Sequence, residues 1–154
     1  MKQLSRQAFS RASQFINTKA RPLEQARFNY HFKDCPAKEV AIELSEFQKS
    51  SGGFGLDLEP DLRSPSSSPL ASAIGLQILS ELGYSSDFNM VRNCVSYLLD
   101  TYDEEIMTWR PTPRDSNEYP HAPWWHDEDN SLFETFDGFR IIPRLDRRFI
   151  APLL

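Results

Sequence analysis

The chain has 154 residues, of which 40% are hydrophobic, 12% aromatic and 25% charged, a composition typical of a globular protein with a buried core. Its 17 basic and 22 acidic residues give a net charge of −5, which argues against a nucleic-acid-binding surface. No apolar run reaches the roughly 18 residues that a membrane-spanning helix needs, so we expect no membrane span. The length predicts a single domain over residues 1–154, or part of a larger one.

The N-terminal segment is basic and amphipathic but lacks the apolar stretch of a secretory signal, so we expect a cytoplasmic protein. Cys35 and Cys94 stand outside any Cys-x-x-Cys pair, which predicts reduced, buried thiols and no zinc site. No cofactor and no metal are indicated by the sequence.

Apolar residues recur at helical spacing in the first part of the chain. Residues 4–16 form one stripe and continue into what reads as a core helix. A second, short helix is predicted to begin at Pro22, because proline suits the first helical position. A third is predicted to begin near Pro36 and to end before Gly52.

The middle of the chain predicts two further helices. Ser68 and Pro69 open the clearest of them, and Gly83 ends it. Ser86 or Asp87 is expected to cap the next helix, with these residues facing inward: Phe88, Val91, Val95, Leu98 and Leu99. A last short helix is predicted over residues 143–154. No segment alternates as a strand does, so the predicted fold class is all-α.

Two long irregular stretches, residues 50–67 and residues 101–130, separate these helices. The second holds four prolines, all three tryptophans and two of the three histidines. A weak repeat also links the two stretches, because Phe47-Gln48 precedes Gly53-Phe54 just as Tyr97-Leu98 precedes Trp109. The two helix ends lie 50 residues apart, a period found in stacked helical repeats. Function is therefore expected in these aromatic loops.

Residues 47–55 (FQKSSGGFG) and 66–71 (SSSPLA) resemble the repeat of the α/α-toroid superfamily, which holds the protein prenyltransferase β-subunits and the squalene/terpene cyclases. A narrower resemblance, to a bacterial group of prenyltransferase-like proteins, is carried by the segments ARPLE (20–24), YHF (30–32), LEPDL (58–62), PHAPWW (120–125) and DGFRIIPR (137–144). The resemblance implies a toroid of helix pairs around a central cavity.

The length departs from that family. A closed toroid of six helix pairs needs on the order of 200 residues or more. We therefore predict an incomplete α/α toroid, about half of a closed one: a truncated product, a fragment, or a protomer that completes its core with a partner. Such a half exposes an apolar flank, which predicts self-association.

The known chemistries of the family do not carry over. Prenyltransferases hold zinc through an Asp-x-Cys pair, whereas Cys35 directly follows Asp34. Cyclases use Asp-x-Asp-Asp or Asp-Asp-x-x-Asp motifs, and the segment 127–130 (DEDN) only approaches the first. This segment reads as a solvated acidic loop rather than a catalytic or metal-binding motif.

Two carboxylates remain as catalytic candidates. Glu59 and Asp61 flank a proline that stiffens their turn, which suits general acid/base chemistry if burial raises one pKa. The alternative is that they cap turns and pair with Arg63, which we also count as a ligand-binding candidate. Arg21 and Glu24 read as a structural ion pair or a cap.

The proline-flanked His121 is the third catalytic candidate, as a donor or proton carrier. Trp124 and Trp125 are expected to form a wall for a ligand, and Trp109 is a further ligand-binding candidate. The alternative is that both adjacent rings plug the end of the toroid and that His121 bonds a backbone carbonyl. His126 is expected to be exposed, and His31 to pack beside Tyr30.

Three functions fit these residues. The first is a toroid with one cavity that binds an isoprenoid or another small apolar or cyclic molecule, lined by Glu59, Asp61, His121, Trp124 and Trp125. The second is a non-catalytic binding or scaffold module, and the third is a carbohydrate-active toroid enzyme. The residues leave open whether the chain is an enzyme.

Overall fold

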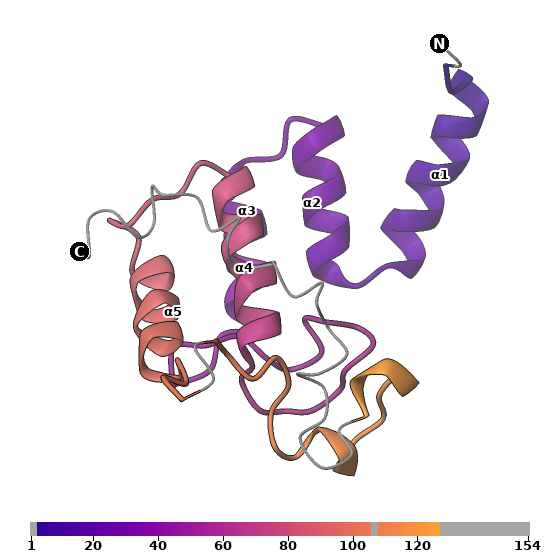
Figure 1. Ribbon diagram of the computed structural model, residues 1–154. Helices are drawn as coiled ribbons and strands as arrows, with labels where there is room; N and C mark the ends of the chain where they lie inside the picture. The colour runs from indigo at the N-terminus through magenta and orange to yellow at the C-terminus, as the bar shows by residue number, and fades with distance from the viewer. Residues whose placement is uncertain (1–2, 106–107, 127–154) are drawn as a thin grey trace. The chain divides into compact units, whose positions relative to one another are not determined.

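The computed structural model describes residues 3–105 and 108–126, and over these residues the fold is all-α, as predicted (Figure 1). The described part contains five α-helices, two short 3₁₀ helices and isolated β-bridges, but no strand. The chain divides into two compact units, Met1–Glu46 and Phe47–Leu154. The single domain and the toroid stay predictions. The last predicted helix and the acidic segment 127–130 lie outside the described residues.

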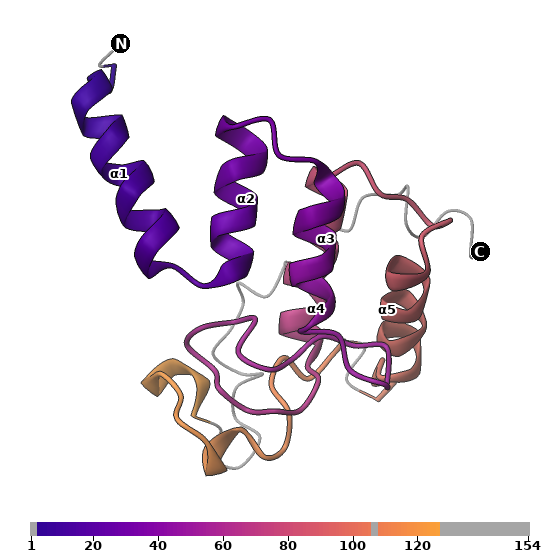
Figure 2. The same ribbon diagram turned by 180° about the vertical axis from the view of Figure 1, so that it is seen from behind.

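The first unit consists of α1 (Arg6–Lys19), α2 (Pro22–Phe32) and α3 (Ala37–Ser45), with α2 lying between its two neighbours (Figures 1 and 2). The Ser5 hydroxyl caps α1 by accepting a hydrogen bond from the backbone N–H of Ala8 at 3.2 Å. As predicted, Pro22 stands at the start of α2.

Aromatic side chains hold α1 and α2 together. The ring of Phe9 lies 6.0 Å from that of Phe28 and 5.7 Å from that of Phe32, between centroids. The residues buried in α2 and α3 are Leu23, Val40, Ala41 and Leu44. The expectation of a core helix at the N-terminus is wrong for the described structure, because α1 has no buried residue and Phe15 is 66% exposed.

The second unit is built around α4 (Pro69–Glu81), which packs against α5 (Asn89–Asp100). The Ser68 hydroxyl caps α4 by accepting from the Ala71 N–H at 3.0 Å, and Gly83 follows the helix with a φ of +81°, both as predicted. Nine of the 13 residues of α4 are buried. This helix therefore supplies a large part of the core of the unit.

Two expectations for α5 are wrong. Its N-cap is Phe88, which makes no side-chain cap, rather than Ser86 or Asp87. The Phe88 N–H donates to the Ser85 carbonyl at 3.0 Å, so a turn precedes the helix and delays its start. Leu99 is 60% exposed, because the inward side is taken by Leu98 and the next residue is rotated by about 100° along a helix.

A bridge and a left-handed glycine close the glycine-rich turn after α3. Gln48 and Phe54 form an antiparallel bridge, and Gly52 adopts a φ of +90°, which favours glycine. The amide Nε2 of Gln48 donates to the Gly52 carbonyl at 2.8 Å and to the Met90 carbonyl of α5 at 2.9 Å. The turn is thereby tied to the first turn of α5.

Phe54 anchors this turn on α4. Its ring is fully buried, and a Cβ atom placed on Gly75 of α4 would lie only 2.6 Å from the ring. Gly53 makes a similar close approach, since a Cβ atom there would lie 2.6 Å from the ring of Tyr97 in α5. The absence of two side chains therefore lets the turn dock between the two helices.

The segment after α5 follows the same plan. Asp103 and Thr108 form an antiparallel bridge with N–H···O distances of 2.9 and 3.2 Å, and the aromatic Trp109 follows at once. The indole N–H of Trp109 donates to the Leu98 carbonyl at 2.6 Å. Each helix end is thus followed by a bridge-closed loop and an aromatic residue, but Phe54 is part of the first bridge whereas Trp109 follows the second. The repeat stays a prediction.

Candidate functional site

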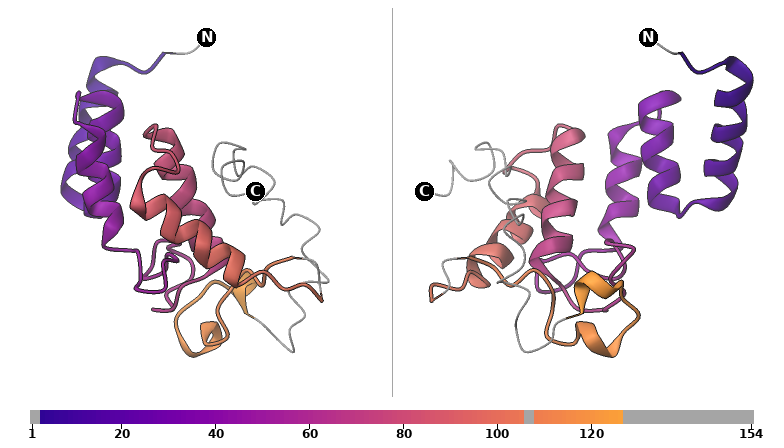
Figure 3. Two further views of the ribbon diagram at one scale, coloured as in Figure 1. Left: turned by 90° about the vertical axis from the view of Figure 1, so that its left-hand side faces the viewer. Right: turned by 45° about the vertical axis from the view of Figure 1, so that its right-hand side comes forward.

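The two long loops meet at the N-terminal end of α4 (Figure 3). The Arg63 N–H donates to the Pro120 carbonyl at 3.1 Å, and the Ala122 N–H donates to the Asp61 carbonyl at 2.8 Å. Leu62 and His121 form the antiparallel bridge between them. We call residues 59–63 and 119–126 the paired-loop site, since backbone bonds join segments that are far apart in the sequence.

A cluster of buried apolar side chains packs against the paired-loop site. Trp125, which is 8% exposed, packs with Leu62 and Leu70, and partly buried Ile74 and Ala122 lie against them. The paired loops therefore pack on an apolar cluster that includes residues of α4.

A carboxylate clamps the neighbouring parts of the loops. The two oxygens of Asp115 accept hydrogen bonds from the hydroxyls of Ser64 and Ser66, each at 2.8 Å. These charge-assisted bonds connect the two long loops to each other, in addition to the backbone hydrogen bonds of the paired-loop site.

His121 and His126 form a hydrogen-bonded pair. Their rings stack with centroids 5.2 Å apart, and Nε2 of His121 lies 2.9 Å from Nδ1 of His126. Nδ1 of His121 lies 2.6 Å from the Tyr119 carbonyl, and a carbonyl only accepts, so this nitrogen carries a hydrogen. In the neutral pair, Nε2 of His121 is therefore the acceptor and Nδ1 of His126 the donor.

The predicted carboxylates lie in the same site but with separate surroundings. Glu59 is half-buried, and its Oε1 accepts from the Asp61 N–H at 3.3 Å, so Glu59 caps its own turn. The side chains of Asp61 and Arg63 are exposed, and within the described residues Arg63 makes no ion pair with either carboxylate. The turn-capping alternative is thus observed for Glu59, but not for Asp61 and not with the ion pair to Arg63.

The three tryptophans have three different environments. Trp124 is 53% exposed, whereas Trp125 belongs to the buried cluster beneath the site. Trp109 is half-buried; its N–H is bonded to Leu98, and its ring lies edge-on to Tyr102 at 4.8 Å. Of the predicted tryptophan wall, only the Trp124 ring is available to a ligand.

Three other expectations about side chains are met. Nε of Arg21 lies 2.8 Å from Oε2 of Glu24, which makes the predicted ion pair. The ring of His31 lies edge-on to Tyr30 at 5.0 Å, and His126 is exposed. Both thiols are free, and Cys94 is buried as predicted, but the prediction of a buried thiol is wrong for Cys35, which is only partly buried.

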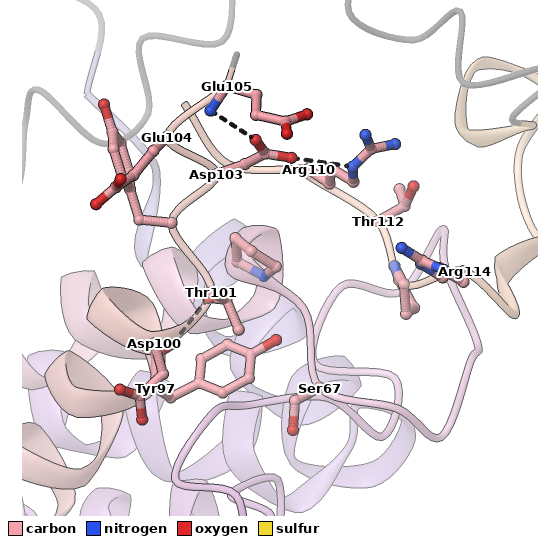
Figure 4. Close-up of a pocket in the computed structure, with 13 residues that line it drawn as sticks. Ser67, Tyr97, Asp100, Thr101, Asp103, Glu104, Glu105, Arg110, Thr112 and Arg114 are labelled. Carbon is pink, nitrogen blue, oxygen red and sulfur yellow. Dashed lines mark hydrogen bonds and ion pairs between the residues drawn. The ribbon is translucent and has the colours of Figure 1, made fainter. Parts of the chain in front are cut away.

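Sequence reasoning missed a pocket beside the C-terminal end of α5. Its volume is about 550 Å³, and it lies between the 100–105 and 110–114 segments (Figure 4). Tyr97 and Thr112 line it, and the ion pair of Asp103 with Arg110, 3.5 Å long, lies along one edge. Tyr97 is not among the residues predicted to face inward in α5, and Thr112 lies in the second predicted loop. No sequence spacing shows that their hydroxyls share one pocket.

The described residues contain no group of three or more His, Cys, Asp or Glu side chains placed to hold a metal ion. Within the same ranges, 3–105 and 108–126, no helix has the length and apolar character needed to cross a membrane. Comparison with known proteins gives no match: no family model, no curated protein and no solved structure is significantly similar to this chain.

Proposed function

We propose that this chain is part of a toroid-type protein that binds an isoprenoid, or another small apolar or cyclic molecule, at the paired-loop site. The observation that carries the proposal is the exposed Trp124, which lies in the same short segment as the hydrogen-bonded histidine pair. The two bridge-closed turns support the toroid part of the proposal, because they repeat one structural unit. A cytoplasmic location belongs to the same proposal.

The chemistry of the site follows from its two kinds of side chain. The Trp124 ring offers an apolar and π-rich face to a hydrocarbon, and the rigid loop lowers the entropy cost of binding. The pair of His121 and His126 places one N–H donor and one acceptor nitrogen at their 2.9 Å contact, and in this proposal these imidazoles act as the general acid or base. Glu59 and Asp61 then act as flanking carboxylates rather than as the primary acid.

Isothermal titration calorimetry with geraniol, an isoprenoid alcohol, tests the binding. We expect saturable binding that weakens about tenfold in Trp124→Ala, because the contact area of one aromatic ring is lost. Trp109→Phe is the matched control and keeps the affinity, since Trp109 lies outside the paired-loop site. Equal affinities of the native chain and Trp124→Ala, or an absence of binding, would contradict the proposal and favour the scaffold alternative.

A further inference from the structure

The pocket beside α5 contains two hydroxyls whose oxygen atoms have no protein partner in the described part of the chain. Tyr97 is 9% exposed and Thr112 is 8% exposed, so about nine-tenths of the surface of each residue is covered. Neither Oη of Tyr97 nor Oγ1 of Thr112 makes a hydrogen bond to another described residue, yet neither oxygen is sealed from solvent. Figure 4 shows the Tyr97 hydroxyl pointing away from α5 into the pocket.

Because neither hydroxyl bonds to another described residue, each is left to bond whatever occupies the pocket. Burial raises the pKa of Tyr97 to about 12, so this hydroxyl keeps its proton and can donate as well as accept at neutral pH. The Thr112 hydroxyl has the same dual capacity. The lining of the pocket thus offers a polar ligand two hydroxyls that can each donate and accept a hydrogen bond.

The charges around the hydroxyls have both signs. Asp103 accepts from the Glu105 N–H at 3.1 Å and pairs with Arg110, which fixes a carboxylate and a guanidinium at one edge. Arg114, from the same 110–114 segment as Arg110, adds an exposed guanidinium. A strongly anionic ligand would meet the carboxylates of the 100–105 segment, and a cationic one would meet the two arginines.

A neutral molecule with several hydroxyls fits this mixture. Each of its hydroxyls can donate to a carboxylate and accept from a guanidinium or another hydroxyl, without net charge. Tyr102, which also lines the pocket and packs on Trp109, adds an aromatic ring for the C–H groups of a sugar. The volume of about 550 Å³ lies in the range of small-molecule sites.

We propose that the pocket lined by Tyr97 and Thr112 binds a mono- or disaccharide. This pocket is separate from the paired-loop site, so the saccharide proposal does not depend on the isoprenoid proposal. The hydroxyls of Tyr97 and Thr112 are the specificity-determining groups, since both residues are largely buried and both oxygens lack a partner among the described residues.

The test is calorimetry of the full chain with four sugars: glucose, N-acetylglucosamine, maltose and cellobiose. We expect at least one to bind at millimolar or lower concentration, and Tyr97→Phe and Thr112→Val each to weaken it about tenfold by removing one hydroxyl. Tyr84→Phe is the matched control, because the Tyr84 ring stacks on Phe88 instead of lining the pocket. An unchanged thermal midpoint in each variant shows that the fold is kept.

Three results would overturn the proposal. They are no binding of any of the four sugars, sugar binding that Tyr97→Phe and Thr112→Val leave unchanged, and binding of glycine betaine in place of sugars with the same dependence on the two hydroxyls. The last result would assign the pocket to a zwitterion. Because geraniol is a separate probe with Trp124 as its contact, none of these results bears on the paired-loop site.

Discussion

The positions of the hydrogens on His121 and His126 follow from one backbone contact. The Tyr119 carbonyl accepts from Nδ1 of His121 at 2.6 Å, and this fixes the direction of the next hydrogen bond along the pair. At the scale of residues, the contact therefore fixes one hydrogen on each ring: the Nδ1–H of His121 points to the Tyr119 carbonyl, and the Nδ1–H of His126 points to Nε2 of His121.

Cys94 gives a prediction about pH at the same scale. Burial raises the pKa of its thiol from 9.0 to about 12. Above pH 9 the unfolded chain loses this proton before the folded chain does, so the free energy of unfolding falls as pH rises toward 12. The slope for one group is at most about 1.4 kcal/mol per pH unit.

Urea unfolding at several pH values between about 8 and 11 measures this slope. We expect Cys94→Ala to lose stability at all pH values because of its cavity, but to show a shallower fall above pH 9 than the native chain. Identical slopes for the two proteins would mean that the thiol does not contribute.

At the scale of elements, the docking of the glycine-rich turn on α4 depends on the missing side chain of Gly75. In Gly75→Ala, the new Cβ atom meets a fully buried Phe54 ring at 2.6 Å, which costs about 1–3 kcal/mol of overpacking. Alanine recovers up to about 1 kcal/mol of helix propensity, so we expect a net loss of stability of about 1–2 kcal/mol in urea unfolding.

The double variant Phe54→Leu/Gly75→Ala checks the cause. Leucine removes part of the ring that the new methyl group meets, so the cost of Gly75→Ala should shrink in that background. If Gly75→Ala costs the same in the native chain and in the Phe54→Leu background, the ring contact is ruled out as the origin of that cost.

The adjacent tryptophans of the second loop provide a matched pair for the next prediction. Trp125→Ala empties the cluster under the paired-loop site and should cost about 3–5 kcal/mol of unfolding free energy. Trp124→Ala should cost less than about 1 kcal/mol, because that ring is mostly exposed. Chemical denaturation of both variants measures the two losses of unfolding free energy. Losses of comparable size would contradict the prediction and show that Trp124 is also part of the core.

Local signals predict the elements better than their meeting points. Ser68, Pro69 and Gly83 mark α4 through cap geometry that depends only on neighbouring residues. The same cap rules do not predict the start of α5, because the turn at Ser85–Phe88 forms in place of a cap at Ser86 or Asp87. A turn of this kind is set by packing around the aromatic ring of Phe88 on Tyr84 as well as by sequence.

For the candidate sites too, the sequence indicates the segment but not how its side chains pack. Proline, histidine and tryptophan spacing indicates the 119–126 segment as a site, but it does not tell Trp124 from Trp125, because only the packing on Leu62 and Leu70 separates them. The unused hydroxyls of the α5 pocket have no sequence signature at all.

At the scale of the whole molecule, the predicted half-toroid should pair with a second copy. The side chains of Leu4, Phe15 and Phe32 in the first unit are each at least 60% exposed, and exposed apolar groups of this size favour association. We expect light scattering to give the mass of a dimer. Phe15→Gln should lower the dimer fraction without loss of folding, and a well-behaved monomer of the native chain would contradict the prediction.

A nitrogen-15 chemical-shift titration with geraniol tests the proposed ligand site most directly. The predicted result is that the indole signal of Trp124 and the imidazole signals of His121 and His126 shift together with one dissociation constant, while the indole signal of Trp109 stays in place. Shifts that leave these three residues unaffected, or no shifts at saturating geraniol, would contradict the assignment of the paired-loop site as the isoprenoid-binding site.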